Sequence, residues 1–330
     1  MKLKKDFLRT LPKVLLHDHL DGGVRAKTVI ELAKEYKYKK LPTTNPRELA
    51  EWFHRGANRG SLPLFLEGFE HTCGVMQTEE SLERVAYEMM EDMKNDGVVY
   101  VETRFAPVFH TDKGLHLETV VKSVLKGLER GKQDFGVHYG LILCALRHMK
   151  PDISIEIAEL AVDFRNQGVV GFDLAGEAFG KESIWQAIQW CGAHRIGHAT
   201  RLVEDMKIED GKVMSMGTLA QYVLDKRVPL EMCLTSNVHT GAVKKLEDHP
   251  FGVYYRYKFR VTLNTDDRLM SNITMTDEYH TAVETFGLGV DDLEKIAINS
   301  MKSAFIPYKQ RIRIIYDVLK PGYAKAKLRK

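Results

Sequence analysis

Short apolar runs alternate with amphipathic stretches along the chain. Seven runs have the length and residue types of buried strands, and they lie at 14–17, 98–102, 137–144, 169–174, 195–198, 229–233 and 260–264. Apolar residues recur with helical spacing between them, at 28–36, 79–95, 117–130, 153–166, 183–190 and 218–224. Regular alternation of strand and helix predicts an α/β fold with a parallel sheet and crossover helices.

The order of these elements is typical of a TIM-type barrel. Polar residues follow several predicted strands, which is where α/β barrels carry their functional groups. No linker rich in Gly, Ser or Pro divides the 330 residues. We therefore expect one barrel domain over 1–330, with extra helices at about 46–76 and a helical C-terminal portion. A closed barrel of this type has eight strands, one more than the pattern supplies.

Composition excludes several classes of partner. The formal charge of +3 is too small to indicate nucleic-acid or membrane binding. No apolar run approaches the length of a membrane span, and the first residues lack the apolar segment of a signal peptide. The four cysteines form no Cys-x-x-Cys pair and sit in apolar runs, which predicts buried free thiols. We expect a cytoplasmic protein.

Histidines and carboxylates at the ends of the predicted strands are the candidates for chemistry. His17 and His19 are two positions apart on the first strand, so both side chains face one side and can bind one metal ion. Taken alone, this pair also fits polar residues that simply end a strand. Asp266 and Asp267 follow the last strand, where one carboxylate can complete a metal site, although adjacent Asp residues also begin turns and helices.

Two further strand ends carry polar groups. Arg195-Ile196-Gly197-His198 ends in a histidine that can act as a base or stabilise charge. The run 171–177, Gly-Phe-Asp-Leu-Ala-Gly-Glu, ends in a glycine, which lets a ligand approach the backbone, and a carboxyl group. Metal ligands, an acid/base carboxyl and a histidine on four strands together indicate metal-assisted hydrolysis.

These motifs, in this order, resemble the adenosine deaminases of the metal-dependent amidohydrolase superfamily. The resemblance covers about 11–305 and includes Leu-His-x-His-Leu-Asp-Gly, Asp-Leu-Ala-Gly, Arg-Ile-Gly-His, Thr-Ser-Asn at 235–237 and Asn-Thr-Asp-Asp. It implies a zinc enzyme that hydrolyses adenosine, and 2′-deoxyadenosine, to the inosine product and ammonia.

The resemblance also implies roles for individual residues. One Zn²⁺ per chain is held by His17, His19 and Asp266. Catalysis falls to Glu177, His198 and Asp267: the glutamate protonates a purine ring nitrogen, and the other two orient the attacking water. The purine nucleoside is contacted by His19, Asp21, Gly176 and Asp267, with Asp21 meeting the ribose. No nucleic acid or membrane is a partner, and the oligomeric state stays open.

The chain departs from the family pattern at one place. Family members have Asp-Leu-Ala-Gly after strand four and His-Ala-Gly-Glu after strand five, whereas this chain has the single hybrid Asp173-Leu174-Ala175-Gly176-Glu177. Leu174 occupies the position where the second motif has a ligand histidine, and leucine cannot bind zinc. About one strand–helix unit is therefore expected to be absent between strands four and six. A segment omitted from the sequence as written, a deletion variant or an engineered chain would each explain this.

Two alternative functions stay open at this stage. The substrate is adenine or a modified adenosine, or the chain is a catalytically impaired purine-binding homologue that lacks the third ligand histidine. Replacement of that ligand by His194 is not expected.

Overall fold

Seven parallel strands form the centre of the molecule. The computed structural model describes residues 3–176 and 180–328. One sheet has the strand order β1-β2-β3-β4, and a second has the order β5-β8-β9. The strands are β1 (Lys13–His19), β2 (Val98–Phe105), β3 (His138–Leu146), β4 (Val169–Ala175), β5 (Ile196–Gly197), β8 (Leu230–Met232) and β9 (Val261–Leu263). All seven predicted strands and the predicted α/β class are confirmed.

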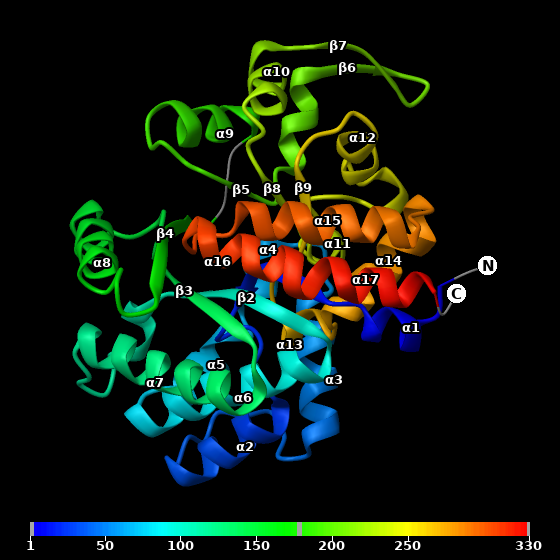
Figure 1. Ribbon diagram of the computed structural model, residues 1–330. Helices are drawn as coiled ribbons and strands as arrows, with labels where there is room; N and C mark the ends of the chain where they lie inside the picture. The colour runs from blue at the N-terminus through cyan, green and yellow to red at the C-terminus, as the bar shows by residue number, and fades with distance from the viewer. Residues whose placement is uncertain (1–2, 177–179, 329–330) are drawn as a thin grey trace.

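The two sheets meet where the first and last strands lie side by side. The segment after β9 forms a parallel bridge with β1, between Asp18 and Asp266. The Asp266 N–H donates to the His17 carbonyl at 2.9 Å, and the His19 N–H donates to the Asp266 carbonyl at 2.8 Å. The strands therefore form one arc that runs from β4 through β1 and β9 to β5 (Figure 1).

The arc ends at β4 and β5, and among residues 3–176 and 180–328 no strand pairs with the outer edge of either. Only Val169 of β4 is buried, whereas six of the seven residues of β1 are. Phe172 is 40% exposed. The arc of described strands is open between β4 and β5, where the sequence predicts the missing unit. A strand with no neighbour on one edge leaves its side chains partly in water, which explains the exposure of β4.

Helices surround the arc (Figure 1). Helix α6 packs on β2, α8 packs on β3 and β4, and α15 covers the junction of β1 with β9. The longer helices are α2 (Ala26–Glu35), α3 (Pro46–Ala57), α6 (Glu79–Asn95), α7 (Leu117–Phe135), α8 (Pro151–Asp163), α9 (Gly180–Gln189), α10 (Thr218–Asp225), α14 (Met275–Phe286), α15 (Val290–Ser303) and α17 (Lys320–Lys327). Shorter helices are α1 (Lys5–Thr10), α4 (Leu62–Leu66), α5 (Phe69–Val75), α11 (Leu234–His239), α12 (Phe251–Arg256), α13 (Arg268–Ser271) and α16 (Tyr308–Arg313).

Local sequence explains where these helices begin and end. Helix α6 starts at Thr78, whose side chain accepts from the Ser81 N–H in a capping box. Helix α7 ends at Gly136, which has the left-handed φ of 70° that glycine adopts without strain. In the part of the chain that is described, no helix combines the length and apolarity needed to cross a membrane.

One element was not expected from the sequence. An antiparallel hairpin of β6 (Met206–Glu209) and β7 (Lys212–Met216) lies outside the arc. Its turn, Asp210-Gly211, has positive φ at both residues, 49° and 72°. An Asp-Gly pair between two short strands is a strong hairpin signal, and that signal was available in the sequence.

Candidate active site

Three side chains converge where β1 meets the segment after β9. The metal-binding atoms of His17, His19 and Asp266 all lie within 4.8 Å of one another. Asp266 Oδ1 is 3.1 Å from His17 Nε2 and 3.4 Å from His19 Nε2. Asp266 has a φ of 61°, an uncommon conformation outside glycine, and its backbone is held there by the bridge to β1. The structure brings together all three residues that the resemblance implies as metal ligands.

The ring of His17 is oriented to bind a metal ion. Its Nδ1 lies 2.8 Å from Glu231 Oε2 on β8, and a carboxylate can only accept, so Nδ1 carries the proton. Nε2 is therefore the available ligand atom, and it is buried without a hydrogen-bond partner. A carboxylate behind a histidine is the usual support of a metal-bound imidazole. Two imidazoles and a carboxylate fit zinc, which uses three protein ligands in catalytic sites.

Two buried arginines hold Glu231 in its charged form. Arg104 on β2 donates to Glu231 Oε2 at 2.9 Å, and Arg195 Nε lies 2.6 Å from Oε1. Arg195 also pairs with Glu102 at 2.5 Å. Burial opposes ionisation of Glu231, but the two arginines hold its pKa well below the usual range. The acceptor behind His17 is therefore ionised at any physiological pH.

The charges around His17 predict that metal binding depends on pH. Burial and Arg104 oppose charge on His17, but the nearby carboxylates of Asp266 and Glu231 raise its pKa above the ordinary value. A metal ion must displace this proton. We expect zinc affinity to rise as the pH increases through the pKa of His17, with proton release on binding. Titration calorimetry in buffers of different ionisation enthalpy measures this release, and pH-independent affinity would contradict it.

His198 lies beside this group. Its ring centroid is 4.8 Å from that of His17, and its Nε2 is 3.8 Å from Asp266 Oδ2. Burial lowers the pKa of His198 to about 4, so the ring is neutral near pH 7. Ser236 donates to Asp266 Oδ2 at 2.6 Å. The candidate His198 is thus adjacent to the three ligand candidates, on the Asp266 side.

Asp267 lies next to the metal-binding group, and Gly22 lies close to its carboxyl group. It is 4% exposed, and its Oδ1 has no hydrogen-bond partner. Burial first, and then the charges of Asp266 and Asp21, raise the pKa of Asp267 well above the ordinary value. A Cβ on Gly22 would lie 1.8 Å from Asp267 Oδ1. The absence of a side chain at Gly22 therefore makes room for this carboxyl group.

This contact predicts the effect of a single methyl group. We expect Gly22→Ala to lower the free energy of unfolding by about 1–3 kcal/mol, because the new Cβ displaces the Asp267 carboxyl group in a packed interior. Gly56→Ala in α3 is the matched control, since a Cβ there meets nothing within 4 Å. The control should be neutral or slightly stabilising. Urea denaturation compares the two, and equal stabilities would contradict the crowding.

Asp21 forms a second buried group with Cys73 and His110. Their candidate ligand atoms lie within 4.8 Å of one another, and His110 Nε2 is 3.6 Å from Asp21 Oδ2. Asp21 Oδ1 and His110 Nε2 are buried without hydrogen-bond partners. Unpaired buried polar atoms are costly unless a ligand or water satisfies them. Asp21, the predicted ribose contact, thus has acceptor capacity to spare.

The hybrid motif begins beside the metal-ligand candidates, where Asp173 accepts from Arg104 at 2.7 Å, but its later residues lie apart from them. Gly176 is exposed, has a φ of 110° and lies closest to Arg147. Leu174 is a half-buried residue of β4 that pairs with Ala145 of β3. The predicted catalytic Glu177 lies outside the described residues. Gly176 has no described contact with His17, His19 or Asp266.

Sequence reasoning missed the residues that support the site. Glu231 and Arg104 lie within apolar strands, and a charge in the middle of a buried strand is the signal that would have found them. Ser236 and Asn237 belong to the Thr-Ser-Asn motif but had no assigned role. His194, which was not expected to replace a ligand, packs near Phe305 with ring centroids 6.2 Å apart.

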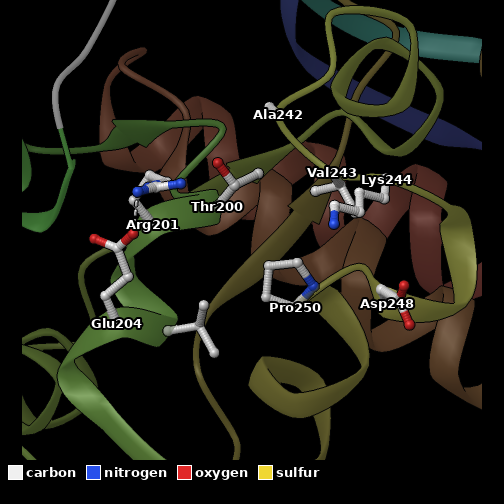
Figure 2. A pocket seen from close by; sticks show the side chains of 9 residues that line it. Thr200, Arg201, Glu204, Ala242, Val243, Lys244, Asp248 and Pro250 are labelled. Atoms are coloured by element: carbon white, nitrogen blue, oxygen red, sulfur yellow. Dashed lines mark ion pairs between the residues drawn. The ribbon is translucent and has the colours of Figure 1, made fainter. Parts of the chain in front are cut away.

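A separate surface pocket lies beyond His198 and does not belong to this site. It is lined by the segments 200–204 and 242–250, and none of the metal-ligand candidates contributes to it (Figure 2). Of the charged side chains that line it, Arg201 pairs with Glu204, and Asp248 pairs with Lys245, which lies outside the lining. No ligand is assigned to it.

A parallel arc of strands with two imidazoles and a carboxylate at its strand ends defines a metal-dependent hydrolase of the α/β-barrel class. The adenosine deaminase family model matches residues 12–177 and 174–321. An adenosine deaminase of Streptomyces coelicolor is 47% identical over 98% of this chain and 89% of its own length. One of Mycobacteroides abscessus is 48% identical, with 95% of each chain covered. The chain belongs to the adenosine deaminase family.

Solved structures agree on the fold. An adenine deaminase from Arthrobacter aurescens has a TM-score of 0.81 at 24% identity and covers 96% of this chain and 98% of its own. An amidohydrolase from Burkholderia ambifaria with bound Zn has a TM-score of 0.84 at 17% identity and covers 99% and 95%. These likenesses confirm the amidohydrolase barrel architecture predicted from the sequence.

The same comparisons locate the missing unit. The two matched segments overlap at 174–177, so these residues correspond to two separate places in the family pattern. The alignments to the two relatives span 356 and 347 positions, more than the 330 residues of this chain. The relatives therefore carry residues that have no counterpart here, and the break between the two matched segments falls at 174–177, at the end of β4.

Proposed function

We propose that this protein catalyses the hydrolytic deamination of adenosine and 2′-deoxyadenosine to the inosine products and ammonia. One observation carries the proposal: the bridge between Asp18 and Asp266 brings the ligand candidates of the first and last strands together, beside His198. The two relatives above, at 47% and 48% identity, bear the name adenosine deaminase.

In this proposal, His17, His19 and Asp266 would hold one Zn²⁺, and the metal would supply activation of a water molecule as the nucleophile. His198, neutral near pH 7, orients that water by a hydrogen bond. Asp267, with its raised pKa and partnerless Oδ1, contacts the water and the purine. His19 contacts the substrate as well as the metal.

The remaining substrate contacts are assigned to Asp21, Glu177 and Gly176. Asp21 accepts a hydrogen bond from a ribose hydroxyl, which would satisfy its buried Oδ1. Glu177 donates a proton to a ring nitrogen of the purine, which makes C6 more electrophilic. Gly176 lets the nucleoside approach the backbone.

The direct test is turnover by the purified, zinc-loaded chain. The absorbance change at deamination is followed with adenosine, 2′-deoxyadenosine, adenine and adenosine 5′-monophosphate as substrates. The proposal expects the two nucleosides to react faster than adenine, which lacks the sugar hydroxyl for Asp21, and faster than the nucleotide, whose 5′-phosphate the Asp21 carboxylate repels. Preference for adenine would favour the alternative substrate, and activity unchanged by Glu177→Gln would remove that residue's role.

A second function is favoured by the overlap at 174–177. The residue at the position of the third imidazole ligand is Leu174, and β4 and β5 have unpaired outer edges in the described structure. A chain of this kind would bind purine nucleosides with weak metal retention and little turnover. Less than one zinc per chain after dialysis, together with nucleoside binding and no turnover, would identify this impaired homologue.

A further inference from the structure

A chain of buried hydrogen bonds ends on the ring of His198. It begins at the backbone N–H of Phe251, which lies 3.1 Å from His249 Nδ1. A backbone N–H can only donate, so Nδ1 of His249 is the acceptor. His249 is 2% exposed, and burial lowers its pKa to about 3, which keeps the ring neutral. A neutral imidazole has one donor and one acceptor, so Nε2 of His249 carries the proton.

Asn237 accepts a hydrogen bond from this N–H, and the bond fixes which way its amide group faces. His249 Nε2 lies 3.0 Å from Asn237 Oδ1, so the amide oxygen is the acceptor and the amide nitrogen points the other way. The amide nitrogen is 2.9 Å from His198 Nδ1. Asn237 is 2% exposed, so water does not compete for either arm. The NH₂ group can only donate, and Nδ1 of His198 must therefore accept.

We propose that Asn237 and His249 are positioning residues that fix the proton of His198 on Nε2, the ring nitrogen that faces Asp266. His198 is thereby a hydrogen-bond donor toward the site. In this tautomer the Nε2 lone pair is occupied by a proton, so it is available neither to bind a metal ion nor to remove a proton.

The ring of His17, which lies beside that of His198, carries its proton on the other nitrogen. Glu231 accepts from Nδ1 of His17 and leaves Nε2 free, while Asn237 donates to Nδ1 of His198 and leaves Nε2 protonated. The two rings are 4.8 Å apart, yet one is prepared as a ligand and the other as a donor. A carboxylate behind one histidine and an amide behind the other make this distinction. We call the chain of hydrogen bonds from the Phe251 N–H through His249 and Asn237 to His198 the relay. The relay follows from these contacts, whereas its value for catalysis rests on the proposed function.

The experiment observes the tautomer directly. Ring nitrogens of protonated and unprotonated type differ in ¹⁵N chemical shift, and a His198→Gln variant identifies the signals of this ring. Spectra are recorded on the full, metal-free chain at a pH where the ring is neutral. We expect Nδ1 of His198 to be unprotonated and Nε2 protonated. The opposite assignment overturns the proposal, whether or not the chain proves to be a deaminase.

An isosteric variant provides the causal test. A carboxylate cannot donate, so Asn237→Asp is expected to move a proton onto Nδ1 of His198. Asn166→Asp, at an exposed position, adds the same charge and should leave the ring unchanged. His249→Gln retains an N–H donor toward Asn237 and should preserve the parent tautomer. A His198 ring unchanged in the folded Asn237→Asp variant, or altered equally by the Asn166 control, would contradict the relay.

If the chain is active, the relay also predicts a kinetic signature. Asn237→Asp should reduce kcat about 10–100-fold, the range typical of lost support to a catalytic group, with KM changed much less. A rise in KM at constant kcat would show that Asn237 serves substrate binding instead.

Discussion

Inserting the segment that the relatives carry between β4 and β5 is expected to raise zinc affinity about a hundredfold or more. The insertion follows Gly176 and ends in the His-Ala-Gly of the family motif, so that Glu177 completes that motif. A structural zinc site contributes about 10–16 kcal/mol over four ligands, or roughly 3 kcal/mol for one. Deaminase turnover should increase with metal occupancy, measured by competition with a chelator and by absorbance.

The matched control separates coordination from closure of the barrel. The same insertion with its motif histidine replaced by alanine supplies the strand but no ligand. It should raise the free energy of unfolding, because the outer edges of β4 and β5 gain partners, while zinc affinity stays near that of the parent chain. Full zinc affinity in the parent chain itself would show that the His17, His19 and Asp266 group is sufficient without a third imidazole.

Replacing Asp266 with asparagine is expected to reduce zinc affinity by about a hundredfold or more, by the same arithmetic. Asp266 is a carboxylate that lies close to Nε2 of both candidate ligand histidines, 3.1 Å from His17 and 3.4 Å from His19. The asparagine side chain has nearly the shape of the aspartate side chain but carries no charge. Loss of the charge should also lower the pKa of His17, since Asp266 raises it in the parent chain. Metal analysis after dialysis and histidine titration by NMR measure the two effects.

Ser236→Ala is the control for Asp266. It removes only the hydrogen bond to Asp266 Oδ2 and leaves the carboxylate in place. Loss of such a supporting bond typically weakens a metal site about 10–100-fold, so the effect should be smaller than that of Asp266→Asn. If the order were reversed, or if Asp266→Asn retained zinc, the ligand assignment would be wrong.

The strands were predictable because each is a short apolar run followed by polar residues, and parallel strands buried on both faces require that pattern. A missing unit was indicated by the count of seven strands, and by the resemblance, since the single hybrid Asp173-Leu174-Ala175-Gly176-Glu177 stands where family members have two motifs. The hairpin at 206–216 was missed although Met206–Glu209 alternates between apolar and polar residues, because its strands are only 4 and 5 residues long. Its Asp-Gly turn was the stronger signal.

The supporting residues of the site were beyond sequence reasoning. Glu231 contacts His17 across 214 positions of sequence, and Asn237 bridges His198 and His249 from α11. Nothing in a single sequence tells which buried glutamate stands behind which histidine. Such contacts depend on strand register and on the angle at which loops return, and both are set by packing of the whole arc.

Residue types and their spacing were enough to predict the alternation of strands and helices, the ligand types at strand ends and the place where a unit is lacking, because this information is local. The tertiary structure decided which ends meet, through the Asp18 and Asp266 bridge, and what each histidine does. His17 lies on β1 and His198 directly after β5, and the two are the same residue type. Glu231 accepts from one and Asn237 donates to the other, so only the folded surroundings distinguish a metal ligand from a proton donor.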